Sequence, residues 1–418
     1  MYNLVVDNIY LFRTVPYIKF GIGATDEIGY DVEKLKVSKV LIVTDKFINE
    51  KTSLPSRVKQ SIEERGIKAE IWDGVEPEPS YSSVKEGIKF AKDKGYEAFI
   101  GLGGGSSIDT AKAINLFTTY PADVYDYIGP PIGKGMKIPG PVKPLIAIPT
   151  TAGTGSEVSP VFVISLPEIK SKVGISADEL RPTQVILDPL NTISMPPNVT
   201  ASTGIDALMH AIEAYTAKPY YTRLKPKTPL ERPVYMGSNP TTDTLAEKAI
   251  ELIGKYLRRA FVNGYDLEAR CNMLLAANIA GIAFTNAGVH VPHAMSFPIG
   301  YRKHLPHGVA VGVCGPSFLD FAVPALPEKH ARIAQLLGEK IDGLSIFEAG
   351  LKASEALIKL LKDLNLPNGI SAVGFSEKDI PELVEDTLKQ QRLLAQSPRP
   401  ISKQDLEQIF LKSLRYEV

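Results

Sequence analysis

The sequence predicts an α/β dinucleotide-binding domain with a parallel sheet over residues 1–190, followed by an all-α domain over residues 191–418. Three observations support this prediction. The first half of the sequence alternates apolar runs with amphipathic segments. After about Pro196, only the periodicity of helices continues. The length of 418 residues is sufficient for two or three domains. Strands that are apolar throughout are typical of a parallel sheet covered on both faces.

The predicted strands of the first half are short apolar runs that end in polar residues or glycine. The segments between them have the spacing of amphipathic helices. The expected strands lie at 39–45, 68–74, 96–105 (with a turn), 143–151 and 183–188, and the expected helices at 56–66, 81–95 and 106–117.

In the second half, the periodicity of apolar residues predicts helices at 198–215, 241–261 and 266–284, and several more toward the end of the chain. Ser376 and Ser402 each precede an acidic residue by three positions, which predicts a capping box at a helix start. The connector 217–240 is rich in proline and basic residues and is too irregular for a helix.

Composition narrows the class of protein. Lys and Arg together number 47, as do Asp and Glu, so the chain has no basic footprint for nucleic acid. The two cysteines, Cys271 and Cys314, form neither a CxxC pair nor a disulfide framework. The first residues lack the features of a secretory signal, and no apolar run approaches the roughly 18 residues of a membrane span. We expect a cytoplasmic protein with no nucleic-acid or membrane partner.

The first chemical motif is FIGLGGGSSIDTAK (99–112), in which a strand meets a glycine turn and a helix opens at Ser106. Glycine lets the backbone approach a phosphate, and the free N–H groups of the helix start attract an anion. Ser106 stands where the third glycine of GxGxxG would be, so the standard fingerprint is not met. Phosphate binding is favoured, and a tight strand-to-helix turn is the alternative.

Two further segments follow predicted strands. Asp45 ends the first strand of the alternating region, where a carboxylate can accept hydrogen bonds from ribose hydroxyls and repel a 2′-phosphate. An aspartate there can equally be a helix cap. The loop IPTTAGTGSEVSP (148–160) offers many hydroxyl donors at a strand end, although it can also be an ordinary connection. With the glycine turn, Asp45 favours NAD over NADP.

Histidines gather in one segment. Four of the six lie in GVHVPHAMSFPIGYRKHLPHG (288–308), a stretch broken by proline and glycine. Upstream, Asp206 and His210 stand at i and i+4 on a mostly apolar helix, so both can touch one ion. An isolated pair of this kind is more often a surface hydrogen bond. One carboxylate with several imidazoles fits Fe²⁺ or Zn²⁺ and excludes a calcium site.

These motifs together resemble the iron-containing alcohol dehydrogenase family, within the dehydroquinate synthase-like fold group. The resemblance covers nearly the whole chain and includes KFGIGATDEIG, GLGGGSSIDTAK, PTTAGTGSEVS, MPPNVTASTGIDALMHAIEAY and SPRPISKQDLEQI. It implies a nucleotide domain, a helical domain and a metal held in the cleft between them. The implied metal ligands are Asp206, His210, His293 and His307, and the implied NAD contacts are Asp45, Gly103, Gly104, Gly105, Ser106, Thr150, Thr154 and Lys172.

The sequence also departs from the family pattern. Phe297 stands where many members carry a second histidine, so that proton-relay group is absent. Glu78 replaces an asparagine of the loop VEPEPS. His290 and His304 are alternative relay candidates, although each is more often a local hydrogen-bonding residue.

Within the family, RPVYMGSNPTTD, DLEARCNMLLAANIAGIAFTNAGVH and PHAMSFPIG resemble the hydroxyacid-oxoacid transhydrogenases. This implies oxidation of 4-hydroxybutyrate to the semialdehyde, with 2-oxoglutarate as hydride acceptor. The alternatives are a plain NAD(P)-dependent primary alcohol dehydrogenase or aldehyde reductase, and an NAD- and metal-dependent lyase or synthase on the same fold. A hydroxyacid needs a cationic partner, for which Arg223 and Arg302 are candidates. We also expect a homo-oligomer that acts on a small alcohol, aldehyde or hydroxyacid.

Overall fold

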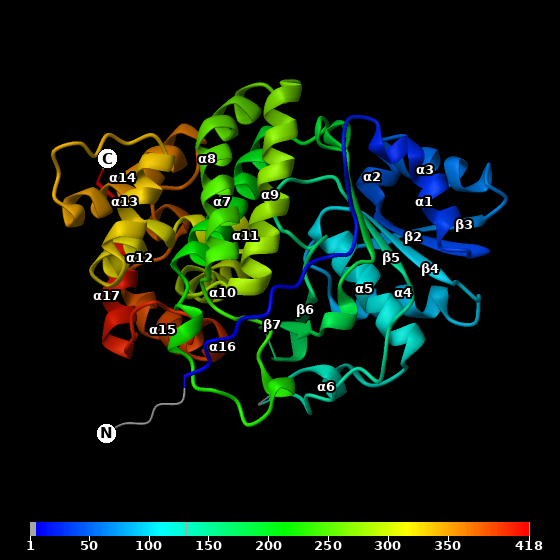
Figure 1. Cartoon of the computed structure of the whole chain (residues 1–418), viewed down its shortest axis with the longest axis horizontal. Helices are drawn as coiled ribbons and strands as arrows, with labels where there is room; N and C mark the ends of the chain where they lie inside the picture. The colour runs from blue at the N-terminus through cyan, green and yellow to red at the C-terminus, as the bar shows by residue number, and fades with distance from the viewer. Residues whose placement is uncertain (1–5, 131, 170, 418) are drawn as a thin grey trace. The chain divides into compact units, whose positions relative to one another are not determined.

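The computed structural model describes residues 6–130, 132–169 and 171–417 (Figure 1). The chain divides into two compact units, one formed by residues 14–195 and the other by residues 6–13 together with 196–417. The first unit is built around a parallel sheet and the second is helical, which confirms the predicted fold class.

The α/β unit contains a six-stranded sheet in which every neighbouring pair is parallel. The four strands at its centre are apolar and almost fully buried, as expected for a sheet with both faces covered. The strands, in spatial order, are β1 (Ile18–Phe20), β8 (Gln184–Leu187), β5 (Leu145–Pro149), β4 (Ala98–Gly103), β2 (Lys39–Asp45) and β3 (Lys68–Val75).

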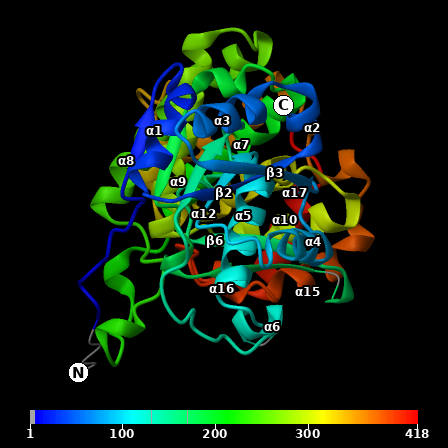
Figure 2. The same ribbon diagram turned by 90° about the vertical axis from the view of Figure 1, so that its right-hand side faces the viewer.

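Strand β2 shows how the two faces are filled. Val40 and Ile42 belong to one core cluster with α1 (Ile28–Lys34) and α3 (Leu54–Glu63). Leu41 and Val43, which point to the opposite face, pack in a second cluster. That cluster includes residues of α4 (Tyr81–Ala91) and α5 (Gly105–Thr119). Figure 2 shows α3 and α4 on opposite sides of β2 and β3. The unit also has the short helices α2 (Lys46–Lys51) and α6 (Val124–Tyr127).

Two parts of this unit were not anticipated from the sequence. Edge strand β1 has only three residues, too few for a periodic pattern. Strands β6 (Val161–Leu166) and β7 (Ser171–Ser176) form a separate antiparallel pair, where a parallel arrangement alone was expected. The pair follows the loop 150–160 directly.

The helical unit begins with α7, which packs against α8, α9 and α11. Capping boxes are present at Ser376 and Ser402, as predicted. The helices are α7 (Pro197–Thr216), α8 (Pro240–Val262), α9 (Leu267–Ala287), α10 (Val291–Lys303), α11 (His307–Gly312), α12 (Gly315–Ala322), α13 (Pro327–Leu336), α14 (Ile346–Asp363), α15 (Ile380–Leu388), α16 (Gln391–Leu394) and α17 (Lys403–Ser413).

Short 3₁₀ helices complete the chain. They lie at Ala24–Glu27, Pro167–Ile169, Asp178–Leu180, Pro189–Thr192, Tyr220–Thr222, Pro229–Glu231, Val323–Ala325, Ile370–Val373 and Glu377–Asp379. The predicted irregular connector 217–240 contains only two of these single turns and no α-helix before Pro240.

The first described residues of the chain belong to the helical unit. Arg232 holds Asp7 in a two-pronged ion pair, with its Nε 2.8 Å from Oδ2 and its Nη2 3.2 Å from Oδ1. The backbone N–H of Arg13 donates to Asn286 Oδ1 at 2.7 Å, and Asn286 Nδ2 donates back to the Arg13 carbonyl at 2.8 Å. Residues distant in sequence therefore anchor this segment.

One segment, His307–Ala325, is apolar and long enough to cross a membrane, contrary to the expectation that no run approaches that length. Of its most apolar window, 78% is buried inside the structure, which is typical of a core helix. A second such stretch arises only if α9 and α10, which are bent by 108° at the break between them, are counted as one.

Candidate active site

Three buried side chains from α7 and α10 meet in the helical unit. Asp206 and His210 lie one turn apart on α7, and His293 comes from the first turn of α10. One potential ligand atom from each lies within 4.8 Å of the others. The i, i+4 spacing on α7 therefore places carboxylate and imidazole as the sequence predicted, and α10 supplies the third group.

His307 joins this cluster from the start of α11. Its Nε2 lies 3.8 Å from Asp206 Oδ1, and the Nε2 atoms of His210 and His293 lie at the same distance from that oxygen. Ligands of a tetrahedral metal with bonds of about 2.1 Å are separated by roughly 3.4 Å. Small side-chain rotations would bring the four atoms to that spacing.

The hydrogen bonding of the cluster is incomplete without a further group. Asp206 Oδ1 and His293 Nε2 are buried and have no hydrogen-bond partner among the described residues. Leaving a buried carboxylate oxygen unsatisfied is costly, and a cation removes the cost. One carboxylate oxygen and three imidazole nitrogens form a donor set that suits Fe²⁺ or Zn²⁺. The residues present therefore fit a metal.

The surroundings favour the protonation states that a metal requires. Burial opposes ionisation of Asp206, yet the nearby imidazoles of the cluster together hold its pKa below the usual value. Burial lowers the pKa of His293 to about 4, so its ring is neutral at pH 7. A carboxylate and a neutral imidazole are the ligand forms.

Glu213 is a buried carboxylate beside the cluster that the sequence analysis missed. Its Oε1 lies 2.6 Å from His293 Nδ1, and its Oε2 accepts a hydrogen bond from the backbone N–H of His290 at 2.6 Å. Burial raises the pKa of Glu213 to about 7. Asp206, His210 and Glu213 stand at i, i+4 and i+7, a single helix face, so the spacing in DALMHAIE was an available signal.

The relay candidates of the histidine-rich segment lie in different settings. His290 is fully buried, its Nε2 is 3.0 Å from Thr216 Oγ1, and burial lowers its pKa to about 4. His304 is exposed and ends α10 in the left-handed conformation, with φ of 49°. Phe297, which replaces the family histidine, stacks against His307 with ring centroids 6.1 Å apart.

Of the two arginine candidates for a substrate carboxylate, Arg302 is engaged elsewhere, whereas Arg223 is engaged only through Nη1 and its buried Nη2 has no hydrogen-bond partner among the described residues. Arg302 forms ion pairs with Glu382 at 2.7 Å and Asp386 at 2.5 Å. Arg223 donates from Nη1 to the Tyr235 carbonyl at 2.5 Å. Arg223 also lies beyond the end of α7 at Thr216, and ten residues of helix from position 206 to 216 rise roughly 15 Å.

In the α/β unit, Asp45 lies at the carboxyl end of β2 and fills the helix-cap role, one of the two roles that the sequence left open. Its Oδ1 accepts from the Ile48 amide at 2.9 Å, which caps α2. Its Oδ2 accepts from Ser107 Oγ at 3.4 Å, beside the glycine turn. The carboxylate is therefore a cap that also stands next to the predicted phosphate loop.

The glycine turn packs against the loop that follows β5. Gly103 has φ of +145°, and a Cβ there would lie 2.4 Å from Ser107 Oγ. A Cβ on Gly105 would lie 2.8 Å from Thr154 Oγ1. The Thr150 amide donates to the Gly103 carbonyl at 2.9 Å. Only glycine permits this approach, and helix α5 opens at the turn without a side-chain cap, as an anion site at a helix start requires.

Lys172, on β7, forms an ion pair with Glu78 at 2.6 Å. Glu78 is held with φ of +55°, in the left-handed region. The loop that carries it is tied to β6, because the Ser165 amide donates to the Pro79 carbonyl at 2.8 Å. Glu78, which replaces the family asparagine, is thus the ion-pair partner of Lys172, a predicted cofactor contact.

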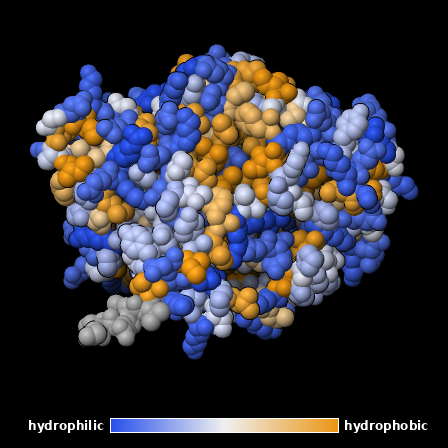
Figure 3. Space-filling model, in the orientation of Figure 1, coloured by the Kyte–Doolittle hydropathy of each residue, from blue (hydrophilic) through white to orange (hydrophobic). Residues whose placement is uncertain are grey.

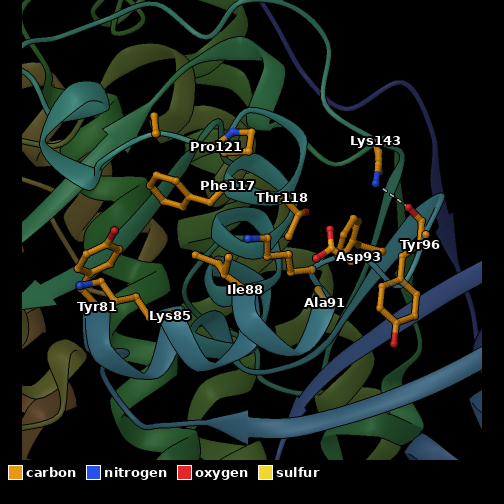
Figure 4. Close-up of a pocket in the computed structure, with 14 residues that line it drawn as sticks. Tyr81, Lys85, Ile88, Ala91, Asp93, Tyr96, Phe117, Thr118, Pro121 and Lys143 are labelled. Atoms are coloured by element: carbon orange, nitrogen blue, oxygen red, sulfur yellow. Dashed lines mark hydrogen bonds between the residues drawn. The ribbon is translucent and has the colours of Figure 1, made fainter.

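A groove of about 340 Å³ lies elsewhere in the α/β unit (Figure 4). Its lining includes Tyr81, Phe117 and Lys143. Lys143 and Tyr96 precede β5 and β4, so the groove lies at the amino ends of those strands. Asp45 and the glycine turn lie at the carboxyl ends, where open α/β sheets bind ligands. The groove is therefore separate from the predicted nucleotide site.

Comparisons with known proteins match this arrangement over most of the chain. The family model described as iron-containing alcohol dehydrogenase matches residues 16–189, and its C-terminal counterpart matches residues 230–414. The mitochondrial hydroxyacid-oxoacid transhydrogenase of Bos taurus is 41% identical over 416 residues, which cover 96% of this chain and 89% of that protein.

Two solved structures share the fold of the whole chain. A 1,3-propanediol oxidoreductase is 34% identical with a TM-score of 0.88, covering 97% of this chain and 100% of that one. The alcohol dehydrogenase of Oenococcus oeni is 32% identical with a TM-score of 0.87, again over 97% and 100% of the two chains.

The relatives correct one prediction. The Bos taurus and Homo sapiens transhydrogenases are mitochondrial by name, which contradicts the cytoplasmic location expected from the sequence. That expectation rested on two cysteines that form no disulfide framework and on the lack of secretory features. Neither observation distinguishes the cytoplasm from an organelle inside the cell.

Proposed function

Because this chain belongs to the iron-containing alcohol dehydrogenase family, we propose that it oxidises a hydroxyacid such as 4-hydroxybutyrate to its semialdehyde and passes the hydride to 2-oxoglutarate. The chain is an enzyme, an oxidoreductase that uses a metal and a nicotinamide-type cofactor on a small-molecule substrate. The transhydrogenase activity is taken from the name of relatives matched over 96% of the chain.

One observation carries the metal-dependent part of the proposal. Three imidazole nitrogens surround a single buried carboxylate oxygen at a common distance of 3.8 Å. We assign the metal ligands as Asp206, His210, His293 and His307, with Fe²⁺ as the metal and Zn²⁺ as the alternative. When bound, the metal would polarise the substrate oxygen and the nicotinamide would take up hydride.

The α/β unit supplies the cofactor contacts in this proposal. The start of α5, which no side chain caps, and the glycines Gly103, Gly104 and Gly105 suit a pyrophosphate, with Ser106 as a further contact. The carboxylate of Asp45 favours NAD, because it would repel the 2′-phosphate of NADP. Thr150, Thr154 and Lys172 would contact the nicotinamide half and its ribose.

Proton handling in this proposal does not involve position 297, because Phe297 has no titratable group and packs on His307. His290 is fully buried and hydrogen-bonded to Thr216, which suits a fixed hydrogen-bonding role better than exchange with solvent.

A plain alcohol dehydrogenase is the second candidate. The ion pairs of Arg302 with Glu382 and Asp386 favour it, because they leave that guanidinium neutralised and without a role toward a substrate carboxylate. The solved relatives named above also include enzymes named for simple alcohols.

The test is turnover by the metal-reconstituted enzyme with 4-hydroxybutyrate, with and without 2-oxoglutarate. Reduced nicotinamide is followed by absorbance and both acids by chromatography. A transhydrogenase forms semialdehyde and 2-hydroxyglutarate in equal amounts, with little net reduced cofactor. Accumulation of reduced cofactor with butanol as well as with the acid would favour the plain alcohol dehydrogenase.

We also propose a homo-oligomer without nucleic-acid or membrane partners. Exposed apolar side chains on and beside edge strand β1, including Tyr17 at 52% and Phe20 at 43% exposure, support self-association. Equal numbers of acidic and basic residues support the absence of a nucleic-acid partner. Figure 3 shows patches of hydrophobic residues, most of them over the middle of the visible face, among hydrophilic ones. Light scattering of the purified protein measures the assembly.

A further inference from the structure

Glu213 contacts the candidate metal cluster without being one of its ligands. Its side chain is fully buried, and both carboxylate oxygens are used, one by the ring of His293 and the other by the backbone of His290. The pair of contacts is short, at 2.6 Å each. Glu213 therefore holds His293 both by its ring and through the start of the helix that carries it.

The hydrogen bond to the ring decides which nitrogen of His293 carries the proton. An ionised Glu213 can only accept, so the Nδ1 atom facing it donates, and Nε2 is left with a lone pair. That Nε2 atom is buried, has no hydrogen-bond partner among the described residues and lies 3.8 Å from Asp206 Oδ1. The lone pair is thus directed to the centre of the cluster.

The second contact fixes the backbone at the corner between α9 and α10. The two helices are bent by 108°, and His290 caps α10 with a non-helical backbone and without a side-chain hydrogen bond. Glu213 Oε2 takes the His290 amide instead, and its negative charge stands at the positive end of the α10 dipole. A glutamine side chain at this position has only one acceptor oxygen. Its NH₂ group would therefore face either the His290 amide or the His293 ring, and that hydrogen bond would be lost.

We propose that Glu213 is a positioning residue that fixes the tautomer and ring orientation of His293 and so sets the metal affinity of the cluster. This inference rests on the metal site proposed above. Carboxylates that orient a histidine ligand in this way typically contribute 10- to 100-fold to metal affinity.

The test compares the affinity for Zn²⁺ and Co²⁺ of the wild type and Glu213→Gln, by competition with a chromophoric chelator. We expect the variant to bind both ions roughly 10- to 100-fold more weakly and to change the Co²⁺ absorption spectrum. Glu213→Asp, which restores the charge, should recover part of the loss. Nitrogen NMR of the metal-free wild type should show the proton of His293 on Nδ1.

Thr216→Val is the matched control, because Thr216 lies one turn further along α7 and bonds His290 Nε2, not His293. It should keep wild-type metal affinity even where thermal unfolding shows lost stability. Equal losses of affinity in Glu213→Gln and Thr216→Val would show a general structural effect and overturn the proposal. A proton found on His293 Nε2 would overturn it as well.

The outcomes separate this inference from the proposed function. If the wild type binds neither ion, the metal site fails and the inference fails with it. If the wild type binds Zn²⁺ and Co²⁺, His293→Ala does not, and Glu213→Gln matches the wild type, only the positioning role of Glu213 fails.

Discussion

The Oδ1 atom of Asp206 and the Nε2 atom of His307 lie 3.8 Å apart, although they come from different helices. The two residues differ in exposure, since the side chain of Asp206 is 3% exposed and that of His307 is 37% exposed. A water molecule can replace an imidazole that faces solvent more easily than a buried carboxylate. The four predicted ligands should therefore not be equivalent.

We expect His293→Ala and Asp206→Ala to abolish Zn²⁺ binding and His307→Ala to weaken it, because only His307 leaves a position that water can reach. NAD binding should stay largely intact in all three variants, since the predicted cofactor contacts lie in the α/β unit. Metal content after dialysis and NAD titration by fluorescence measure the two properties. Full metal content in His293→Ala would exclude the ligand assignment.

Replacing Asp45 should shift cofactor preference toward NADP, because a carboxylate that repels the 2′-phosphate is removed. Asp45→Asn keeps an oxygen to cap α2 at the Ile48 amide, whereas Asp45→Gly loses that bond at a cost of a few tenths of a kcal/mol. Both variants should shift the ratio of kcat/KM for NADP and NAD. An unchanged ratio in both would show that Asp45 is only a helix cap.

Removing the metal should lower the thermal stability of the protein. A metal ion that binds only the folded state raises the free energy of unfolding by about 2.7 kcal/mol when its free concentration is 100 times its Kd. Without the ion, Asp206 Oδ1 remains buried and unsatisfied. Thermal unfolding with and without a chelator measures the change, and the Tm of His293→Ala should not respond to the chelator. Equal responses in both proteins would place the stabilising metal elsewhere.

A pH-dependent contribution to stability is expected at Glu70. Its hydrogen bonds to Lys39, Tyr96 and Lys94 outweigh burial and lower its pKa from 4.5 to about 2. Because the pKa of Glu70 is lower in the folded than in the unfolded state, its ionised form stabilises the folded protein above pH 4.5. This contribution is lost as the pH falls from about 4.5 to about 2. Glu70→Gln should thus reduce the free energy of unfolding at pH 7 and reduce it less at pH 3. Urea unfolding at the two pH values tests this, and an equal reduction would contradict it.

Periodicity and fixed spacings predicted most of the fold. Strand β2 (Lys39–Asp45) has the bounds expected from the apolar run KVLIVTD. Strand β1 was missed because its pairing with β8 depends on residues distant in sequence. The antiparallel pair β6–β7 was also missed, although its two strands are close in sequence. A three-residue edge strand is defined by its neighbour β8 rather than by its own residues.

The cluster was predictable only in part. The i, i+4 spacing of Asp206 and His210 sets their relation on one helix, whereas the approach of His293 and His307 depends on how α10 and α11 pack, which no local spacing determines. Glu213 stands on the same face of α7, but a single acidic residue on an apolar helix does not indicate its partner. The engagement of Arg302 by Glu382 and Asp386 likewise depends on tertiary packing.

The anchoring of residues 6–13 in the helical unit sets an order for folding during synthesis. This segment is synthesised before the rest of the described chain, yet Asp7 and Arg13 bind Arg232 and Asn286, which are added more than two hundred residues later. The α/β unit is complete by residue 195 and can fold while the leading segment is still unpartnered. The helical unit therefore closes only after both ends of its sequence are available, and its cooperative unfolding should include the first described residues of the chain.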